Sequence, residues 1–159
     1  MTMLVGFGYD VHRLVPGRPL VLGGVRIPHA LGLDGHSDAD VILHALMDAL
    51  LGAAGLGDIG QQFPPSDPAY KGADSLDLLR RVVALLEAEG YRPVNCDITL
   101  LAERPKIGPH VGQMRERISG VLGVAPRRVG IKATTNEGMG FVGREEGMAA
   151  YAVALIAEA

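Results

Sequence analysis

The stretch from Leu33 to Gly60 constrains the fold of this chain more than any other. It begins with a turn, continues as a long apolar segment, and closes with a glycine-rich acidic loop. Ser37 and Asp40 fit the capping-box pattern, in which side chains bind the free N–H groups of a helix start. Apolar residues then recur at helical spacing and predict one buried face. These residues are Ile42, Leu46, Ala49, Leu50 and Ala53.

A polar stripe is expected on another side of this helix, because Asp40, His44 and Asp48 are spaced four residues apart. Two carboxylates beside an imidazole would fix its tautomer, as they do for metal-binding histidines. His36 and Ser37 lie at the expected N-terminus, where free N–H groups favour an anion. The alternative, left open by this stretch alone, is that Ser37 only caps the helix and the stripe is a solvated face.

Composition limits the classes of protein to consider. The 159 residues are 48% hydrophobic but only 4% aromatic, so we expect one domain, residues 1–159, with an aliphatic core. A net charge of −3 argues against binding to nucleic acid or to an anionic membrane. Cys96 is the single cysteine, which excludes an internal disulfide. With no signal peptide and no membrane-spanning run, we expect a cytoplasmic protein.

The remaining elements alternate irregularly between strands and helices, which predicts an α+β domain with helices packed on a sheet. Strands are expected at Leu4–Tyr9, Val94–Leu101, Val129–Ala133 and Met148–Ile156, with a hairpin of Leu20–Leu22 and Val25–Ile27. Helices are expected at Ser75–Glu89 and Pro109–Leu122. Gln61–Gly72 reads as a polar loop, and Thr134–Gly147 as an irregular glycine-rich segment.

A metal site is suggested by Asp10 and His12 at the end of the first strand. Side chains two residues apart in a strand project from the same face. The pair is weak by itself, because an Asp at a strand end followed by an exposed His would look the same. Together with His44 it gives two imidazoles and one carboxylate, with a fourth position open. That ligand count is typical of catalytic zinc.

Basic and hydroxyl-bearing residues follow the expected strands in the second half of the chain. Each alone says little, because exposed Lys and Arg are usually solvated. Together with His36 and Ser37 they suggest a site for a multiply phosphorylated ligand. A metal site with nitrogen and oxygen ligands and a second site with hard oxygen ligands would then bind different parts of that ligand. The basic and hydroxyl-bearing residues are Arg104, Lys106, Lys132, Thr134, Thr135 and Arg144, and Glu137 adds a hard carboxylate.

Six segments match one family in order along nearly the whole chain. They are GYDVH at 8–12, GGVRIP at 23–28, HSDADVILHALMDALLGAAGLGDIG at 36–60, FP with a following Asp at 63–67, KGADS at 71–75 and KATTNEGMGFVGREEG at 132–147. The chain thereby resembles the 2-C-methyl-D-erythritol 2,4-cyclodiphosphate synthase family of the non-mevalonate isoprenoid pathway. A small departure is Asn136, which stands where a third Thr is common.

The resemblance implies a reaction and an assembly. Members convert 4-diphosphocytidyl-2-C-methyl-D-erythritol 2-phosphate into the cyclic diphosphate and release CMP, through attack of the substrate's own 2-phosphate on the β-phosphorus. The expected fold is a mixed four-stranded main sheet with helices on one face and a small N-terminal hairpin. Members are homotrimers with active sites between subunits. The competing class is a non-enzymatic regulator that binds a nucleotide or an isoprenoid diphosphate, and it would not need an intact zinc set.

The resemblance also implies roles for individual residues. Asp10, His12 and His44 would bind zinc, and Glu137 would bind a second divalent ion, Mg²⁺ or Mn²⁺. His36 and Thr135 would stabilise the transition state, and Ser37 would hold the diphosphate. The expected methylerythritol contacts are Asp58, Ile59, Gly60, Phe63, Pro64, Pro65, Ser66 and Asp67. The expected cytidine contacts are Ala102, Glu103, Arg104, Pro105, Lys106, Ile107, Gly108 and Thr134, and further ligand contacts are Val11, Asn136, Phe141 and Arg144.

Overall fold

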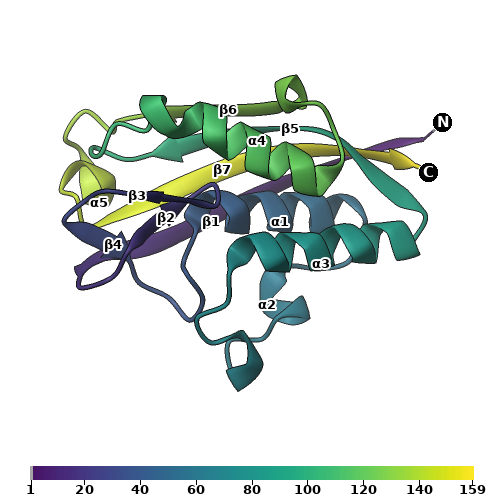
Figure 1. The fold of residues 1–159 in the computed structure, drawn as a ribbon, viewed down its shortest axis with the longest axis horizontal. Coiled ribbons are helices and arrows are strands. Elements are labelled where there is room, and N and C mark those ends of the chain that lie inside the picture. Colours follow the sequence, from purple (N-terminus) through teal and green to yellow (C-terminus); the bar gives the residue numbers. More distant parts are fainter. Residues whose placement is uncertain (1) are drawn as a thin grey trace.

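A five-stranded mixed sheet forms one layer of the molecule, and three long helices cover one of its faces (Figure 1). The computed structural model describes residues 2–159. The strand order is β4 (Leu31–Leu33), β1 (Met3–Pro16), β7 (Gly147–Glu158), β5 (Tyr91–Leu101) and β6 (Val129–Thr134). β5 and β6 run parallel, and the other neighbours are antiparallel. The predicted α+β class is confirmed.

The covering helices are α1 (Val41–Ala53), α3 (Ser75–Ala88) and α4 (Val111–Leu122). β2 (Leu20–Leu22) and β3 (Val25–Ile27) form the predicted separate hairpin. Short helical turns lie between these elements: α2 (Ile59–Gln62), α5 (Gly140–Gly143), and the 3₁₀ turns Pro68–Tyr70, Gly108–His110 and Pro126–Arg128. The helix expected at Pro109–Leu122 therefore begins later, at Val111. No described helix has the length and hydrophobicity that a membrane crossing would need.

The expectation of a four-stranded main sheet is wrong, because β4 is a fifth strand. β1 continues beyond its apolar part to Pro16, and Leu14 to Pro16 pair with Leu31 to Leu33. Only three residues long, β4 has too few side chains for an alternating pattern, so its pairing with β1 defines it. Met148–Ile156 was expected as a strand, and this is confirmed by β7.

Helix α1 packs unusually close to β1, and two glycines of β1 allow this. A Cβ atom at Gly6 would lie 1.8 Å from the carbonyl oxygen of Ala49, and one at Gly8 would lie 1.9 Å from that of Ala45. Any larger residue would therefore push the helix off the strand. The close approach brings His44, on α1, to the face of β1 that carries Asp10 and His12.

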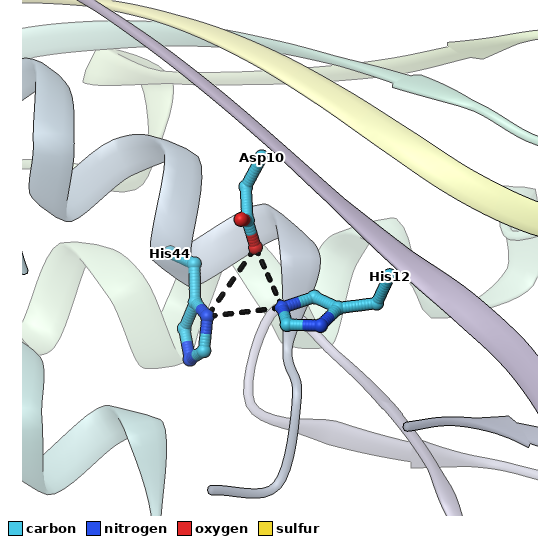
Figure 2. Close-up of side chains that lie close together, drawn as sticks. All are labelled: Asp10, His12 and His44. Carbon is cyan, nitrogen blue, oxygen red and sulfur yellow. Dashed lines mark hydrogen bonds and ion pairs between the residues drawn. The ribbon is translucent and has the colours of Figure 1, made fainter. Parts of the chain in front are cut away.

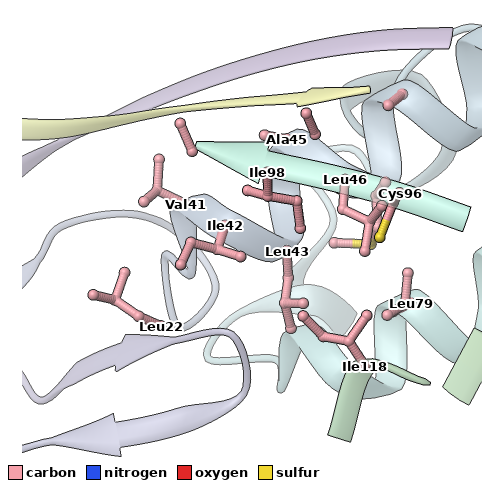
Figure 3. Packing of buried hydrophobic residues seen from close by; sticks show 14 of the residues in the cluster. Leu22, Val41, Ile42, Leu43, Ala45, Leu46, Leu79, Cys96, Ile98 and Ile118 are labelled. Atoms are coloured by element: carbon pink, nitrogen blue, oxygen red, sulfur yellow. The ribbon is translucent and has the colours of Figure 1, made fainter. Parts of the chain in front are cut away.

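The prediction that α1 has one apolar face and a polar stripe is wrong. Its side chains are buried on nearly all sides, and only Asp48 and Gly52 are not fully buried. Figure 3 shows why: α1 lies in the middle of the core, with Ile98 of β5 on one side and Leu79 of α3, Ile118 of α4 and Leu22 of the hairpin around it. A helix that is apolar all round is a core helix.

The helix also starts later than the capping box predicted. Asp40 is the N-cap of α1, and its carboxylate accepts a hydrogen bond from the backbone N–H of Leu43. The same carboxylate accepts from the N–H groups of Gly23 and Gly24, at 3.0 and 2.7 Å. Ser37 therefore lies in the loop before the helix. The observed N-cap differs from the predicted one because Asp40 also binds the hairpin turn, a contact that local sequence does not specify.

The face of the sheet opposite the helices, here called the outer face, exposes large apolar side chains. Alternate residues of β1 point to this side, while the residues between them point toward α1. The rings of Tyr151 and Tyr9 lie 5.0 Å apart. The exposed apolar residues on β1 and β7 are Met3, Val5, Phe7, Tyr9, Val11, Tyr151 and Val153.

Candidate metal centre and ligand cavities

Asp10, His12 and His44 converge on one point, and their ligand atoms could hold a metal ion (Figure 2). Asp10 Oδ2 lies 2.7 Å from His12 Nε2 and 3.3 Å from His44 Nδ1, and the two nitrogens are 3.2 Å apart. A tetrahedral zinc with bonds of 2.0–2.1 Å would place its ligand atoms about 3.3 Å apart. The structure thus brings the three predicted ligands together, with two separations close to that value and the Asp10–His12 separation shorter.

The hydrogen bond made by His12 Nδ1, on the outer side of the ring, determines which ring nitrogen carries the proton. His12 Nδ1 lies 2.9 Å from the backbone carbonyl oxygen of Asp34. A carbonyl can only accept, so Nδ1 carries the proton and Nε2 presents its lone pair to the centre. This contact could not be predicted from sequence, because it depends on the backbone of the loop after β4.

Charge balance at the centre also suits a cation. Asp10 Oδ2 is buried and receives no hydrogen bond of good geometry from the described residues. Burial would raise the pKa of Asp10, but the neighbouring His12 and His44 imidazoles outweigh it and lower that pKa. Burial would lower the pKa of His44, but the Asp10 carboxylate outweighs it and raises that pKa. A positive charge is therefore favoured at this point, and a divalent cation could replace the proton.

The predicted pairing of His44 with Asp40 and Asp48 is wrong. Asp40 binds the backbone at the hairpin turn and the helix start, as described above. Asp48 Oδ1 accepts a hydrogen bond of 2.9 Å from the backbone N–H of Ile59. His44 Nε2 is instead bonded to two hydroxyls, Ser37 Oγ at 3.1 Å and Ser75 Oγ at 3.0 Å. Serine 75 comes from α3, 31 residues away, so no helical spacing on α1 could have identified it.

A cavity of about 230 Å³ opens beside the metal centre. His36 lies on its wall, and His36 Nε2 is 3.1 Å from the carbonyl oxygen of Asp67, which joins the loop after α2 to this wall. Tyr70, from the loop expected at Gln61–Gly72, also lines it, as does Leu78, which the sequence did not single out. The predicted site residues on its wall are Asp10, His12, His36, Ser37, His44, Ile59, Gly60, Phe63 and Pro65.

Asp58 and Asp67, two other expected contacts in this region, cap short helical turns. Asp58 accepts from the N–H of Gln61, and Asp67 accepts from the N–H of Ala69. Their carboxylates thus shape the backbone around the cavity. Neither is on the cavity wall, and the same is true of Pro64 and Ser66.

A second cavity, of about 400 Å³, lies at the ends of β5 and β6. Of the charged residues expected there, Lys106 is on the wall, whereas Glu103 and Arg104 are not, and Lys132 adds a second positive charge. Pro109, Val111, Ile131 and Ala133 complete the wall without having been predicted as contacts. The predicted residues on this wall are Ala102, Pro105, Lys106, Ile107, Gly108, Thr134 and Thr135.

The turn after β6 is held by Glu103. Its carboxylate accepts from the N–H groups of Asn136 and Gly138, at 2.7 and 2.9 Å. Glu137 lies between them with a φ of 54°, a left-handed conformation that costs energy for a non-glycine residue. The N–H of Glu137 donates to Thr135 Oγ1 at 3.2 Å. Glu103 thus fixes the turn that carries Thr135 and Glu137.

The other expected contacts lie outside the walls of these two cavities. Val11 and Phe141 line a third cavity, of about 290 Å³, next to His12. Arg104 pairs with Glu145, and Arg144 pairs with Glu146; all four side chains are substantially exposed. Exposed pairs of this kind contribute little to stability.

The metal centre and the second cavity are far apart within one chain. Asp10 pairs with Ala150, Ala150 pairs with Leu100, and Leu100 pairs with Ala133, so these residues form one row across the sheet. Neighbouring strands are about 4.8 Å apart, so three steps separate Asp10 from Ala133 by about 14 Å. The structure therefore does not bring His44 together with Thr134, Thr135 and Lys106.

Comparison with known proteins gives a consistent result. A profile of the YgbB family matches residues 3–157. The chain belongs to this family. A relative from Symbiobacterium thermophilum named 2-C-methyl-D-erythritol 2,4-cyclodiphosphate synthase is 83% identical over 155 residues, which cover 98% of this chain and 99% of the relative. The resemblance noted in the sequence is thereby confirmed.

Solved structures of this family share the fold. The bifunctional IspDF from Campylobacter jejuni matches with a TM-score of 0.95 and 40% identity, over 99% of this chain and 43% of that longer protein. A 2C-methyl-D-erythritol-2,4-cyclodiphosphate synthase described as its CDP-bound form matches with a TM-score of 0.88 and 40% identity, over 96% of this chain and 99% of that one.

Proposed function

We propose that this YgbB family member cyclises 4-diphosphocytidyl-2-C-methyl-D-erythritol 2-phosphate to 2-C-methyl-D-erythritol 2,4-cyclodiphosphate. An oxygen of the substrate's 2-phosphate forms a bond to the β-phosphorus, and the bond from that phosphorus to the oxygen of the α-phosphate breaks. CMP leaves with the electron pair. Because the nucleophile belongs to the substrate, the protein needs to supply only positioning and charge stabilisation.

The convergence of Asp10, His12 and His44 is the observation that carries this proposal. Two imidazole nitrogens and one carboxylate oxygen would hold zinc and leave a position for a phosphate oxygen. A bound zinc ion would act there as a Lewis acid on the phosphoryl group. The three side chains come from the buried helix α1 and the adjoining strand β1, so their geometry is fixed before substrate binds.

His36 and Ser37 would hold the phosphates beside the metal centre. Both lie on the wall of the 230 Å³ cavity, in the loop before α1. The hydrogen bond between His36 and the Asp67 carbonyl would keep the imidazole at the cavity wall. The apolar part of the wall, from Ile59, Gly60, Phe63 and Pro65, suits the methylerythritol unit.

The second cavity would bind the cytidine. Backbone groups of Ala102 and of residues 105–108 lie at its wall and would contact the pyrimidine base, and the Lys106 side chain would contact its phosphate; Thr134 lies at the same wall. A related structure described as bound to CDP supports a cytidine nucleotide as ligand. Thr135 would stabilise the transition state, and Glu137 would bind a second divalent ion, Mg²⁺ or Mn²⁺, at the phosphates. Phe141 and Arg144 would make further ligand contacts.

A homotrimer with active sites between subunits would unite the two cavities. Within one chain they are three strands apart, too far for one diphosphate to be in contact with both His44 and Thr135. The exposed apolar outer face is the kind of surface that subunit contacts cover. In a cyclic trimer the metal centre of one subunit would then face the second cavity of its neighbour.

The test is to incubate the purified protein with the authentic substrate and follow the phosphorus NMR spectrum. The cyclic diphosphate and CMP should appear at the same rate. Trapping a phosphorylated side chain during turnover would contradict the intramolecular mechanism. Binding of the substrate with no CMP release would favour the non-enzymatic regulator instead.

A further inference from the structure

We propose that Asp38 and Ser75 are positioning residues that set the tautomer of His44 for metal binding. The inference rests on the metal role assigned above to Asp10, His12 and His44. It concerns the Nε2 side of the His44 ring, which points away from Asp10 and His12 and toward the hydroxyls of Ser37 and Ser75.

Ser75 is the first residue of α3, and its side chain is fully buried. Ser75 Oγ lies 3.0 Å from His44 Nε2 and donates its own proton to Asp38 Oδ1. An ionised carboxylate can only accept hydrogen bonds. Since the one hydroxyl proton of Ser75 is used on Asp38, Ser75 Oγ must act as the acceptor toward His44. The proton of the neutral imidazole is therefore held on Nε2, and the lone pair of Nδ1 faces Asp10 and His12.

Ser37, the other hydroxyl beside His44 Nε2, cannot fix the tautomer in the same way. Ser37 Oγ accepts a 3.2 Å hydrogen bond from the N–H of Ala39, which leaves its hydroxyl proton free to rotate. It could donate to His44 or accept from it. Ser75 would be equally ambiguous without Asp38, so the carboxylate is the group that decides.

Asp38 is itself held in place by the backbone. Its Oδ2 accepts from the N–H of Ser75 at 2.9 Å, and its Oδ1 accepts from the N–H of Asp40 at 3.1 Å. These bonds join the starts of α1 and α3 and keep the negative charge beside the Ser75 hydroxyl. The competing explanation is that Asp38 only ties the two helix starts together and has no effect through Ser75.

The two explanations differ in how the variants combine. Partners that orient a metal-binding histidine are typically worth about 10–100-fold in metal affinity. We expect Ser75→Ala and Asp38→Asn each to weaken zinc binding by about that factor, measured by chelator competition. If Asp38 acts through the Ser75 hydroxyl, Asp38→Asn should cause little further loss in the Ser75→Ala background. If Asp38 only tied the two helix starts together, Asp38→Asn would lower zinc affinity by the same factor in the unchanged protein and in the Ser75→Ala variant.

Asp74→Asn is the matched control. Asp74 is exposed, also lies at the start of α3, and its carboxylate accepts a backbone N–H, that of Leu76. It forms no bond to the Ser75 hydroxyl, so its variant should keep the zinc affinity of the unchanged protein. A loss equal to that of Asp38→Asn would overturn the proposal.

A second measurement reads the proton directly. In the zinc-loaded unchanged protein, NMR should detect a proton on His44 Nε2 that exchanges slowly with water, and this signal should weaken or shift in Asp38→Asn and Ser75→Ala. Normal zinc affinity in both variants would refute the positioning role and leave the proposed reaction intact. Failure of the unchanged protein to bind zinc or release CMP would instead refute the proposed function.

Discussion

The two ends of the proposed active site are built in different ways. The candidate metal centre lies between the largely buried helix α1 and the long strand β1, and each of its imidazoles has a partner on its outer nitrogen. Thr134, Thr135 and Glu137 lie on an exposed strand end and turn, which Glu103 and exposed ion pairs hold. One chain can thus preorganise the three candidate metal ligands, whereas the proposed nucleotide end is open on the side of Thr134 and Glu137, whose side chains are exposed. This difference is consistent with the proposed homotrimer, in which the contact between two subunits completes the active site.

The largest effect is expected from His44→Ala, which removes a ligand from the preorganised end. Loss of the ion would remove several kcal/mol of transition-state stabilisation, so activity should fall by about 10³-fold or more. Elemental analysis should find about one zinc per chain before the change and little after it. Equal zinc in both proteins would remove His44 from the ligand set.

Cys96→Ser serves as the control for this change. Cys96 lies on β5 in the core, and burial raises the pKa of its thiol to about 12, so the thiol stays protonated at neutral pH. It can act neither as a nucleophile nor as a thiolate ligand. Zinc content and activity should therefore remain.

Mixing subunits tests whether the two ends meet between chains. His44→Ala and Thr135→Ala should each be inactive alone but should complement each other in mixed rings. With random equal mixing about three-quarters of the trimers are hybrid, and each hybrid has one junction with both ends intact, so about a quarter of all sites should work. Activity no higher than that of the unmixed variants, after verified subunit exchange, would place each site within one chain.

Glu103→Gln should disturb the nucleotide end alone. An amide retains one oxygen acceptor, so one of the two charge-assisted bonds to Asn136 and Gly138 is lost. Such bonds are worth about 1.5–3 kcal/mol, so KM or kcat should change by about tenfold or more, while zinc content stays the same. The adjacent Arg104→Ala, which breaks only an exposed ion pair, should change either constant by less than about fivefold. Loss of zinc in Glu103→Gln would mean that the two ends are not independent.

The smallest effect is expected from Asp48→Asn. Asp48 is one helical turn from His44 but bonds to the N–H of Ile59, and an amide oxygen can keep that bond. Zinc affinity should change by much less than the typical 10–100-fold of a histidine partner and by less than in His12→Ala. If Asp48→Asn lost zinc as fully as His12→Ala, Asp48 would have to bind the metal or His44 directly.

The sequence by itself located the three long helices, at least part of each long strand, and the set Asp10, His12 and His44. Periodicity and a strand-end Asp-x-His pair are local features, and a family match places His44 beside them. The cavity-wall residues Tyr70 and Leu78 carry no such local signal. The sheet also contains a fifth strand, β4, whose three residues are too few to show a strand pattern in the sequence.

Only the tertiary structure decided how these residues are held. Asp40 seemed to be a partner of His44, yet it caps α1 and binds the hairpin turn, while the hydroxyl of Ser75 from α3 takes the place beside the imidazole. Spacing along a helix specifies which side chains share a face, but it does not specify what the neighbouring elements bring to that face. Hydrogen bonds between residues 31 or 37 positions apart form only when α1 and α3 pack together.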